Sequence, residues 1–169
     1  MTDRGVIVRP ARPSDVPAVV AMVHELAEYE RSAHLCRLAD DQLHAALFAD
    51  APALFGHVAE GVDGEPVGFA LWFLNFSTWE GVHGVYLEDL YVRPSARGLG
   101  AGRALLSALA RICRERGYRR LEWWVLHWNP AREFYDAIGA VAMDEWIPYR
   151  VEGDALEELA AHPLLAGKP

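Results

Sequence analysis

The feature that most constrains this fold is a strand, a glycine-rich turn and an amphipathic helix that follow one another between residues 85 and 116. Large apolar residues predict a strand over 85–92, and Pro94 ends it because proline cannot donate to a ladder. From about Gly102 the apolar residues recur at helical spacing. Backbone N–H groups of the glycine turn, together with the positive end of the helix dipole, would favour an anion such as a phosphate group.

The turn alone does not identify a ligand, since many glycine turns only connect a strand tightly to a helix. The lysine of a P-loop is missing, which argues against a nucleoside triphosphatase. The pattern Arg-x-x-Gly-x-Gly over residues 97–102, after a strand that ends in Leu90, Tyr91 and Val92, resembles the acetyl-CoA-binding motif of the GNAT acetyltransferases. In that family the loop holds the pyrophosphate of coenzyme A, and the strand backbone pairs with the pantetheine arm.

The resemblance covers essentially the whole chain to about Glu158. Segments 26–30, 86–89 and 144–146 are similar to the diamine (spermidine/spermine) and thialysine N-acetyltransferase group. The resemblance implies acetyl-CoA as co-substrate, bound by Leu90, Tyr91, Val92, Arg97, Gly98, Leu99, Gly100, Ala101, Gly102, Arg103 and Asn129. It also implies a small cationic amine as substrate, bound by Tyr29, Glu30, Glu88, Asp89, Trp124, Asp144 and Glu145.

Apolar periodicity and turn residues predict one domain over residues 1–169 with mixed strand and helix order. Strands are expected at 6–9, 54–60, 67–76, 85–92, 121–126, 141–143 and 147–151. Helices are expected at 14–29 with Ser14 as N-cap, and at 40–48, 102–116, 130–139 and from about 154. This order indicates an α/β (α+β) sandwich with one largely antiparallel central sheet, flanked by helices, as in the GNAT acyl-CoA N-acyltransferase fold.

Composition excludes some function classes. The formal net charge of −8 argues against sequence-independent nucleic-acid binding and suits a cationic substrate, although acidic surfaces mostly serve solubility. No apolar run is long enough to span a membrane, and the first ten residues do not resemble a signal segment, so we expect a cytoplasmic protein. Seven histidines and two cysteines show neither metal-ligand spacing nor a disulfide framework, and we expect no metal.

Glu88 is the candidate base for acetyl transfer, because an amine that arrives as an ammonium ion must lose a proton before it can attack. A regular strand would place Tyr86, Glu88 and Leu90 on one face and Asp89 on the other. Burial would raise the pKa of Glu88 toward that of a working base. The alternative is a structural carboxylate paired with an arginine. The resemblance gives Glu88 a contact with the amine and gives Asp89 a part in binding the cation.

Tyr135 is the candidate acid that protonates the leaving thiolate, by the family layout and because Phe134 and Ile138 form the better core stripe of its helix. Backbone N–H groups near Leu90 would stabilise the oxyanion, and a β-bulge beside Glu88 would supply free donors. Trp123 and Trp124 would point to opposite faces of their strand, so that one could meet the amine.

Two departures from the family pattern bear on these roles. The turn between Asn129 and Tyr135 is one residue shorter than usual, which argues against the cofactor role of Asn129. The loop at 77–81 lacks the aspartate of polyamine-acetylating members, so a short amine or amino-acid side chain is favoured; Glu80 is the candidate replacement for the missing acid. Acetylation of a protein lysine or N-terminus, or a non-catalytic acyl-CoA sensor, are the alternatives. The resemblance also implies a homodimer.

Overall fold

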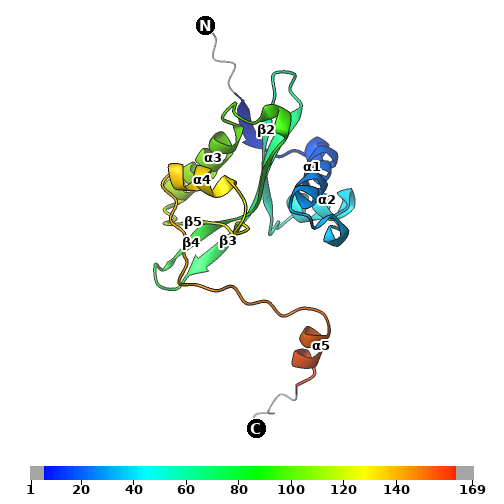
Figure 1. Ribbon diagram of the computed structural model, residues 1–169, viewed down its shortest axis with the longest axis vertical. Coiled ribbons are helices and arrows are strands. Elements are labelled where there is room, and N and C mark those ends of the chain that lie inside the picture. The colour runs from blue at the N-terminus through cyan, green and yellow to red at the C-terminus, as the bar shows by residue number, and fades with distance from the viewer. Residues whose placement is uncertain (1–5, 163–169) are drawn as a thin grey trace. The chain divides into compact units, whose positions relative to one another are not determined.

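The structure is a computed structural model that describes residues 6–162, and the chain divides into two compact units, Met1–Trp124 and Val125–Pro169. The first unit holds the sheet, and the second holds two short helices (Figure 1). The single domain expected from the sequence stays a prediction. No helix among residues 6–162 is long and apolar enough to cross a membrane.

A five-stranded sheet in the order β1-β2-β3-β4-β5 forms the centre of the first unit. Neighbouring strands from β1 to β4 are antiparallel, and β5 is parallel to β4. The strands are β1 (Ile7–Pro10), β2 (Phe55–Glu60), β3 (Pro66–Ser77), β4 (Val82–Val92) and β5 (Leu121–Glu122). The helices are α1 (Val16–Tyr29), α2 (Asp40–Phe48) and α3 (Ala101–Arg116). The predicted mixed, largely antiparallel sheet flanked by helices is therefore confirmed.

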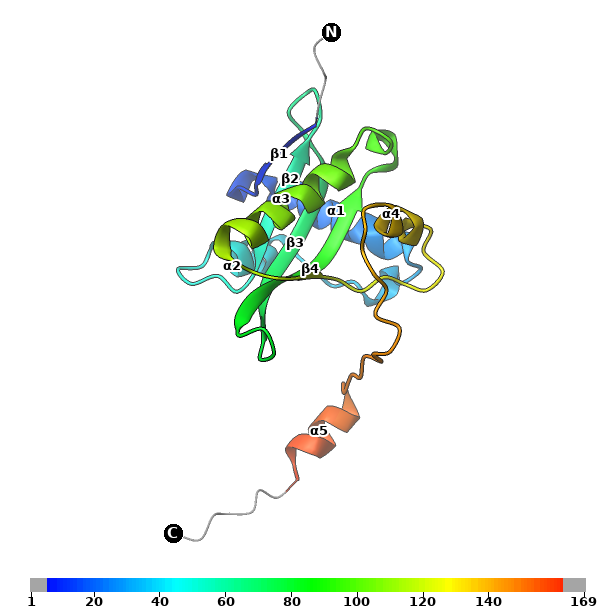
Figure 2. The ribbon, with the colours of Figure 1, turned by 90° about the vertical axis from the view of Figure 1, so that its left-hand side faces the viewer.

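Helices cover both faces of this sheet, with α1 and α2 on one face and α3 on the other (Figures 1 and 2). On the first face, the apolar sides of α1 and α2 meet buried residues of β2, β3 and β4, including Val58, Phe69, Leu71 and Tyr91. On the second face α3 buries four residues of the stripe predicted from its spacing, Leu105, Leu106, Leu109 and Cys113, while the fifth, Ile112, is half-buried. This double cover leaves β4 as a central strand whose two faces have different surroundings.

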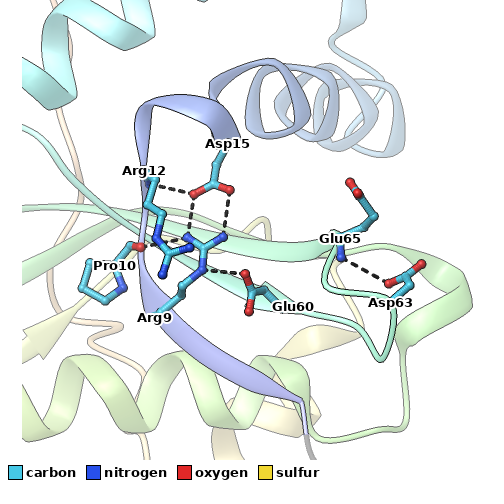
Figure 3. A network of polar contacts seen from close by, with 7 residues as sticks. All are labelled: Arg9, Pro10, Arg12, Asp15, Glu60, Asp63 and Glu65. Carbon is cyan, nitrogen blue, oxygen red and sulfur yellow. Dashed lines mark hydrogen bonds and ion pairs between the residues drawn. The ribbon is translucent and has the colours of Figure 1, made fainter.

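A charged network around Arg9 ties β1 to β2 and to the chain before α1 (Figure 3). The Arg9 guanidinium donates to both carboxylate oxygens of Asp15, at 2.7 and 2.9 Å, and to Glu60 at 2.6 Å. The Arg12 N–H also donates to Asp15, at 2.6 Å. Ser14 is not the N-cap that the sequence predicted. It lies inside a 3₁₀ turn, Pro13–Asp15, because the Asp15 carboxylate rather than a serine hydroxyl accepts the N–H at the start of this turn.

The second unit departs most from the sequence-based expectation. It contains α4 (Ala131–Ala137) and α5 (Asp154–Ala160), close to the two predicted helices. The strands predicted at 141–143 and 147–151 are wrong, since the described residues there adopt neither strand nor helix. Their side chains are exposed, and apolar alternation without a neighbouring ladder is not enough to form a strand. The strand predicted at 121–126 is also shorter, because only Leu121 and Glu122 pair with β4.

Candidate functional site

A β-bulge interrupts β4 at Glu88. On β3, Leu71 lies opposite Asp89, but the next residue, Trp72, lies opposite Leu87. Glu88 is therefore the extra residue, without a partner on β3. The bulge that the sequence analysis expected beside Glu88 is confirmed.

The bulge changes which side chains share a face. Residues directly opposite each other on two strands point to the same side of a sheet. Asp89 lies opposite Leu71, Tyr86 lies opposite Phe73, and these two β3 residues are two apart, so Asp89 and Tyr86 share the face covered by α1 and α2. The prediction that Tyr86 and Asp89 lie on opposite faces is wrong, because the extra residue shifts the alternation by one.

The two adjacent acids of β4 differ in exposure. Glu88 is exposed, whereas Asp89 is half-buried. Burial, together with the nearby charges of Glu88 and Glu30, raises the pKa of Asp89 from 3.8 to about 6. Glu88 is therefore not buried as expected. The burial, and the rise in pKa that it causes, occur at Asp89 instead. Among residues 6–162 neither carboxylate takes part in a hydrogen bond or ion pair, so the alternative of an arginine-paired Glu88 finds no support in this part of the chain.

The end of α1 brings two further predicted residues, Tyr29 and Glu30, toward this part of β4. Burial raises the pKa of Glu30, and its charge acts on Asp89. The helix ends with the Ser32 N–H bonded to the Ala27 carbonyl at 2.8 Å, and with Arg31 in the left-handed region at φ 60°. This tight ending turns the chain directly after Glu30 and fixes where the helix stops.

The glycine turn has the geometry expected of an anion site. Gly98 and Gly100 have φ of 78° and 82°, in the left-handed region that other residues avoid. The first helical bond of α3 runs from the Ala104 N–H to the Gly100 carbonyl, so the N–H groups of 101–103 have no acceptor within the helix. A Cβ at Gly98 or Gly100 would meet no atom within 4 Å, so the hollow beside the turn is open. The predicted residues 98–103 thus combine open space beside two glycines with backbone N–H groups at the start of a helix.

Arg97 connects this turn to both α1 and β4. Its Nε donates to the Val92 carbonyl at 3.0 Å. Its guanidinium lies 5.5 Å from the ring centroid of Tyr29 and 5.7 Å from that of Tyr91. The structure therefore brings together a predicted cofactor residue, Arg97, and a predicted substrate residue, Tyr29. Cation–π contact with two rings holds the guanidinium at the mouth of the turn.

The edge of β4 opposite β3 is largely unpaired where the strand approaches the glycine turn. β5 pairs with β4 only at Val85 and Tyr86, so among residues 6–124 no strand pairs with that edge over residues 87–92. Unpaired backbone groups of a strand can bind an extended ligand as an added strand would. Leu90, Tyr91 and Val92, the residues predicted to pair with the pantetheine arm, lie on this stretch.

Aromatic side chains line β4 on the α1 side of the bulge. Tyr86 contacts Phe73 at 4.9 Å between ring centroids and meets Trp124 edge to face at 6.2 Å. Trp124 is 62% exposed, which leaves most of its surface for a partner molecule. Trp123 is half-buried; since β5 ends at Glu122, the opposite orientation predicted for the two tryptophans stays a prediction.

Tyr86 is a residue that sequence reasoning did not assign to the site. Burial raises its pKa, and the charges of Glu88 and Glu122 add to the effect. Glu122 in turn binds the Asn75 amide at 2.8 Å and pairs with Arg120 at 2.9 Å. Strand alternation alone would have associated Tyr86 with Glu88; the contact with Trp124 depends on the fold.

Four predicted residues lie in the second unit: Asn129, Tyr135, Asp144 and Glu145. The Asn129 side-chain oxygen accepts the Ala131 N–H at 2.9 Å and so caps the start of α4. Tyr135 is half-buried in α4 with its ring 5.4 Å from that of Phe134. Asp144 and Glu145 are exposed. Their predicted roles stay predictions.

Glu80 does not join the acids at the bulge. It precedes β4 and pairs with Arg119 at 2.8 Å. The six residue-to-residue steps along the strand from Val82 to Glu88 separate the two regions by about 20 Å. Among residues 6–162, no three His, Cys, Asp or Glu side chains gather as a metal site would require.

Comparison with known proteins adds a sequence context to this geometry. A model of the acetyltransferase (GNAT) family matches residues 19–140. Thialysine N-epsilon-acetyltransferase of Bos taurus is 36% identical over 166 residues, which cover 92% of this chain and 97% of that protein. L-ornithine N5-acetyltransferase of Arabidopsis thaliana is 28% identical, over 90% of this chain and 86% of that protein. Among solved structures, an integron cassette protein from the mobile metagenome of V. cholerae superposes with a TM-score of 0.77 at 29% identity, over 93% of this chain and 98% of that one.

Proposed function

Since the chain belongs to the acetyltransferase (GNAT) family, we propose that it transfers an acetyl group from acetyl-CoA to the primary amine of a small cationic substrate. The substrate class would be a diamine, a polyamine or a thialysine-like amino acid, attacked directly in a ternary complex. The observation that carries the proposal is the bulge of β4. It places two carboxylates beside an open strand edge that leads into the glycine turn.

The residues present fit acetyl-CoA as the donor. The N–H groups of 98–103 would bind the pyrophosphate, because they lie at the start of a helix and the space beside Gly98 and Gly100 is open. Arg97, at the mouth of the turn, would add a positive charge. The open edge at Leu90, Tyr91 and Val92 would pair with the pantetheine arm, and Asn129 would contribute from the second unit. The bound co-substrate supplies the acetyl thioester.

The site also suits a cationic amine. The negative charges of Glu30 and Glu88 both act on Asp89, and among residues 6–162 no ion pair holds its carboxylate. Trp124 is an exposed aromatic residue whose face can bind an ammonium group, and Tyr29, whose ring already contacts Arg97, would line the same site. The similarity to thialysine and ornithine acetyltransferases favours a short amine that carries an amino-acid group over a long polyamine.

The chain's own residues would perform three steps. A carboxylate at the bulge, Glu88 or Asp89, accepts a proton from the substrate ammonium. Backbone N–H groups that the bulge leaves free stabilise the oxyanion of the tetrahedral state. Tyr135 donates a proton to the departing thiolate. Asp144 and Glu145 would help to hold the substrate, if they come from the partner subunit of a homodimer.

Exposed apolar side chains in the second unit support the dimer. They lie in the segment 141–151, which forms no strand, and comprise Val141, Met143, Trp146, Ile147, Tyr149 and Val151. A run of this kind is a common feature of association surfaces. We propose a homodimer in the cytoplasm. Light scattering of the purified protein would test the dimer, and a mass of one chain would contradict it.

The test of the activity is thiol release from acetyl-CoA with a panel of lysine, thialysine, ornithine, putrescine, spermidine and a lysine-containing peptide. We expect turnover with one or more small amines, and a loss of about 10²–10⁴-fold in kcat for Tyr135→Phe. Release with the peptide alone would favour protein acetylation instead. Tight acetyl-CoA binding without release on any amine would favour an acyl-CoA sensor.

A further inference from the structure

We propose that Asp89, rather than Glu88, is the group that accepts the proton from the substrate ammonium. The inference rests on the proposed acetyl transfer and deepens it. It follows from the bulge, which separates two neighbouring acids into different environments.

The register of β3 and β4 fixes the position of Asp89. Its place opposite Leu71 turns it toward the face covered by α1 and α2, and the residue is half-buried there. Glu88, the extra residue of the bulge, has no partner on β3 and is exposed. A base works best where water is partly excluded, because its proton affinity then approaches that of the group it must deprotonate.

The charges that act on Asp89 are negative from two elements. Glu88 acts from β4 itself, and Glu30 acts from the end of α1, while its neighbour on β3 is the apolar Leu71. Within residues 6–162 no hydrogen bond or ion pair holds the Asp89 carboxylate. Burial and the two acids raise its pKa to about 6, so it is mostly ionised at neutral pH yet close to the optimum of a base. An ammonium ion is the partner that this arrangement lacks.

In the proposed acetyl transfer an N–H bond of the ammonium breaks, and an O–H bond forms on Asp89. The freed lone pair forms the C–N bond to the acetyl carbonyl carbon, and the C–S bond then breaks. Tyr135 protonates the thiolate, and the resulting phenolate accepts the second proton from the nitrogen. Asp89 returns its proton to solvent, so each turnover releases one proton.

The test compares wild type, Asp89→Asn and Glu88→Gln in kcat and KM between pH 5 and 9, with lysine and thialysine as matched nucleophiles. In thialysine a sulfur atom withdraws electron density, so its side-chain amine is less basic and needs less help from a base. For Asp89→Asn we expect a loss of about 10²–10⁴-fold in kcat, loss of the acidic limb of the pH profile, and a smaller defect with thialysine. For Glu88→Gln we expect less than about a tenfold loss, with the acidic limb retained.

Two results would overturn the inference. One is an Asp89→Asn enzyme that keeps kcat and its acidic limb while only KM rises, which would make Asp89 a binding group alone. The other is loss of the limb in Glu88→Gln. Thermal melting and acetyl-CoA titration verify that the variants fold and bind the donor. A wild-type protein that neither binds acetyl-CoA nor acetylates any amine would overturn the proposed function itself, and this inference with it.

Discussion

The guanidinium of Arg97 lies over the ring of Tyr91, 5.7 Å from its centroid, while its Nε donates to the Val92 carbonyl. The first residue of the glycine turn is thereby fixed to the last residues of β4. These contacts hold the long side chain of Arg97 beside the proposed pyrophosphate site. It also links that site to α1, since Tyr29 of this helix lies on the same guanidinium.

Replacement of Arg97 should weaken acetyl-CoA binding. For Arg97→Ala we expect the Kd for acetyl-CoA to rise about tenfold, equivalent to about 1.4 kcal/mol, through loss of charge and of the cation–π contacts. Arg97→Lys should fall between, because lysine keeps the charge without the planar group. Calorimetric titration measures both, and equal affinity for all three proteins would contradict the assignment.

Gly100→Ala should separate binding from stability when it is compared with Gly117→Ala. Both glycines have positive φ, at 82° and 71°, and at both a Cβ would meet no atom within 4 Å. Each variant should lose about 1–2 kcal/mol of unfolding free energy from strain. Only Gly100→Ala places a methyl group in the proposed pyrophosphate hollow, so only it should weaken acetyl-CoA binding by more than about tenfold. Equal binding by both variants would place the pyrophosphate elsewhere.

Asp15→Asn should destabilise the fold at neutral pH. The contact with Arg9 holds the pKa of Asp15 below its ordinary 3.8, so its contribution is present above that value and is lost as pH falls through the lowered pKa. We expect a cost of about 2–3 kcal/mol at pH 7, since the half-buried Arg9 loses one of two carboxylates. Urea unfolding at pH 7 and in acid measures the difference between variant and wild type, which should narrow on acidification.

Asp89→Asn should have the opposite effect on stability. The pKa of Asp89 is raised from 3.8 to about 6 in the folded protein, so the stability that its protonated form contributes is complete below pH 3.8. That stability is lost as pH rises to about 6. At pH 8 the variant should therefore be more stable than wild type by on the order of 2 kcal/mol, and at pH 4 nearly equal to it. Melting temperatures at the two pH values check this; a variant less stable at pH 8 would refute the unpaired state of Asp89.

Local patterns predicted several elements closely. The helix expected at 40–48 is α2 (Asp40–Phe48), and the one expected from about Gly102 begins at Ala101. Apolar spacing and end signals suffice there, since helical contacts are made within a few residues. The glycine turn was predictable for the same reason, because φ above zero is a property of single residues.

The sequence by itself determined the largely antiparallel sheet, the glycine turn at the start of α3 and the adjacency of Glu88 and Asp89. Tertiary structure alone decided which of these acids is buried, because one unpaired residue in β4 reverses the alternation relative to β3. It also decided that residues 141–151 form no strand. Both outcomes depend on strand pairing, which joins residues distant in the chain, and a side-chain pattern specifies one strand without specifying its partner or register.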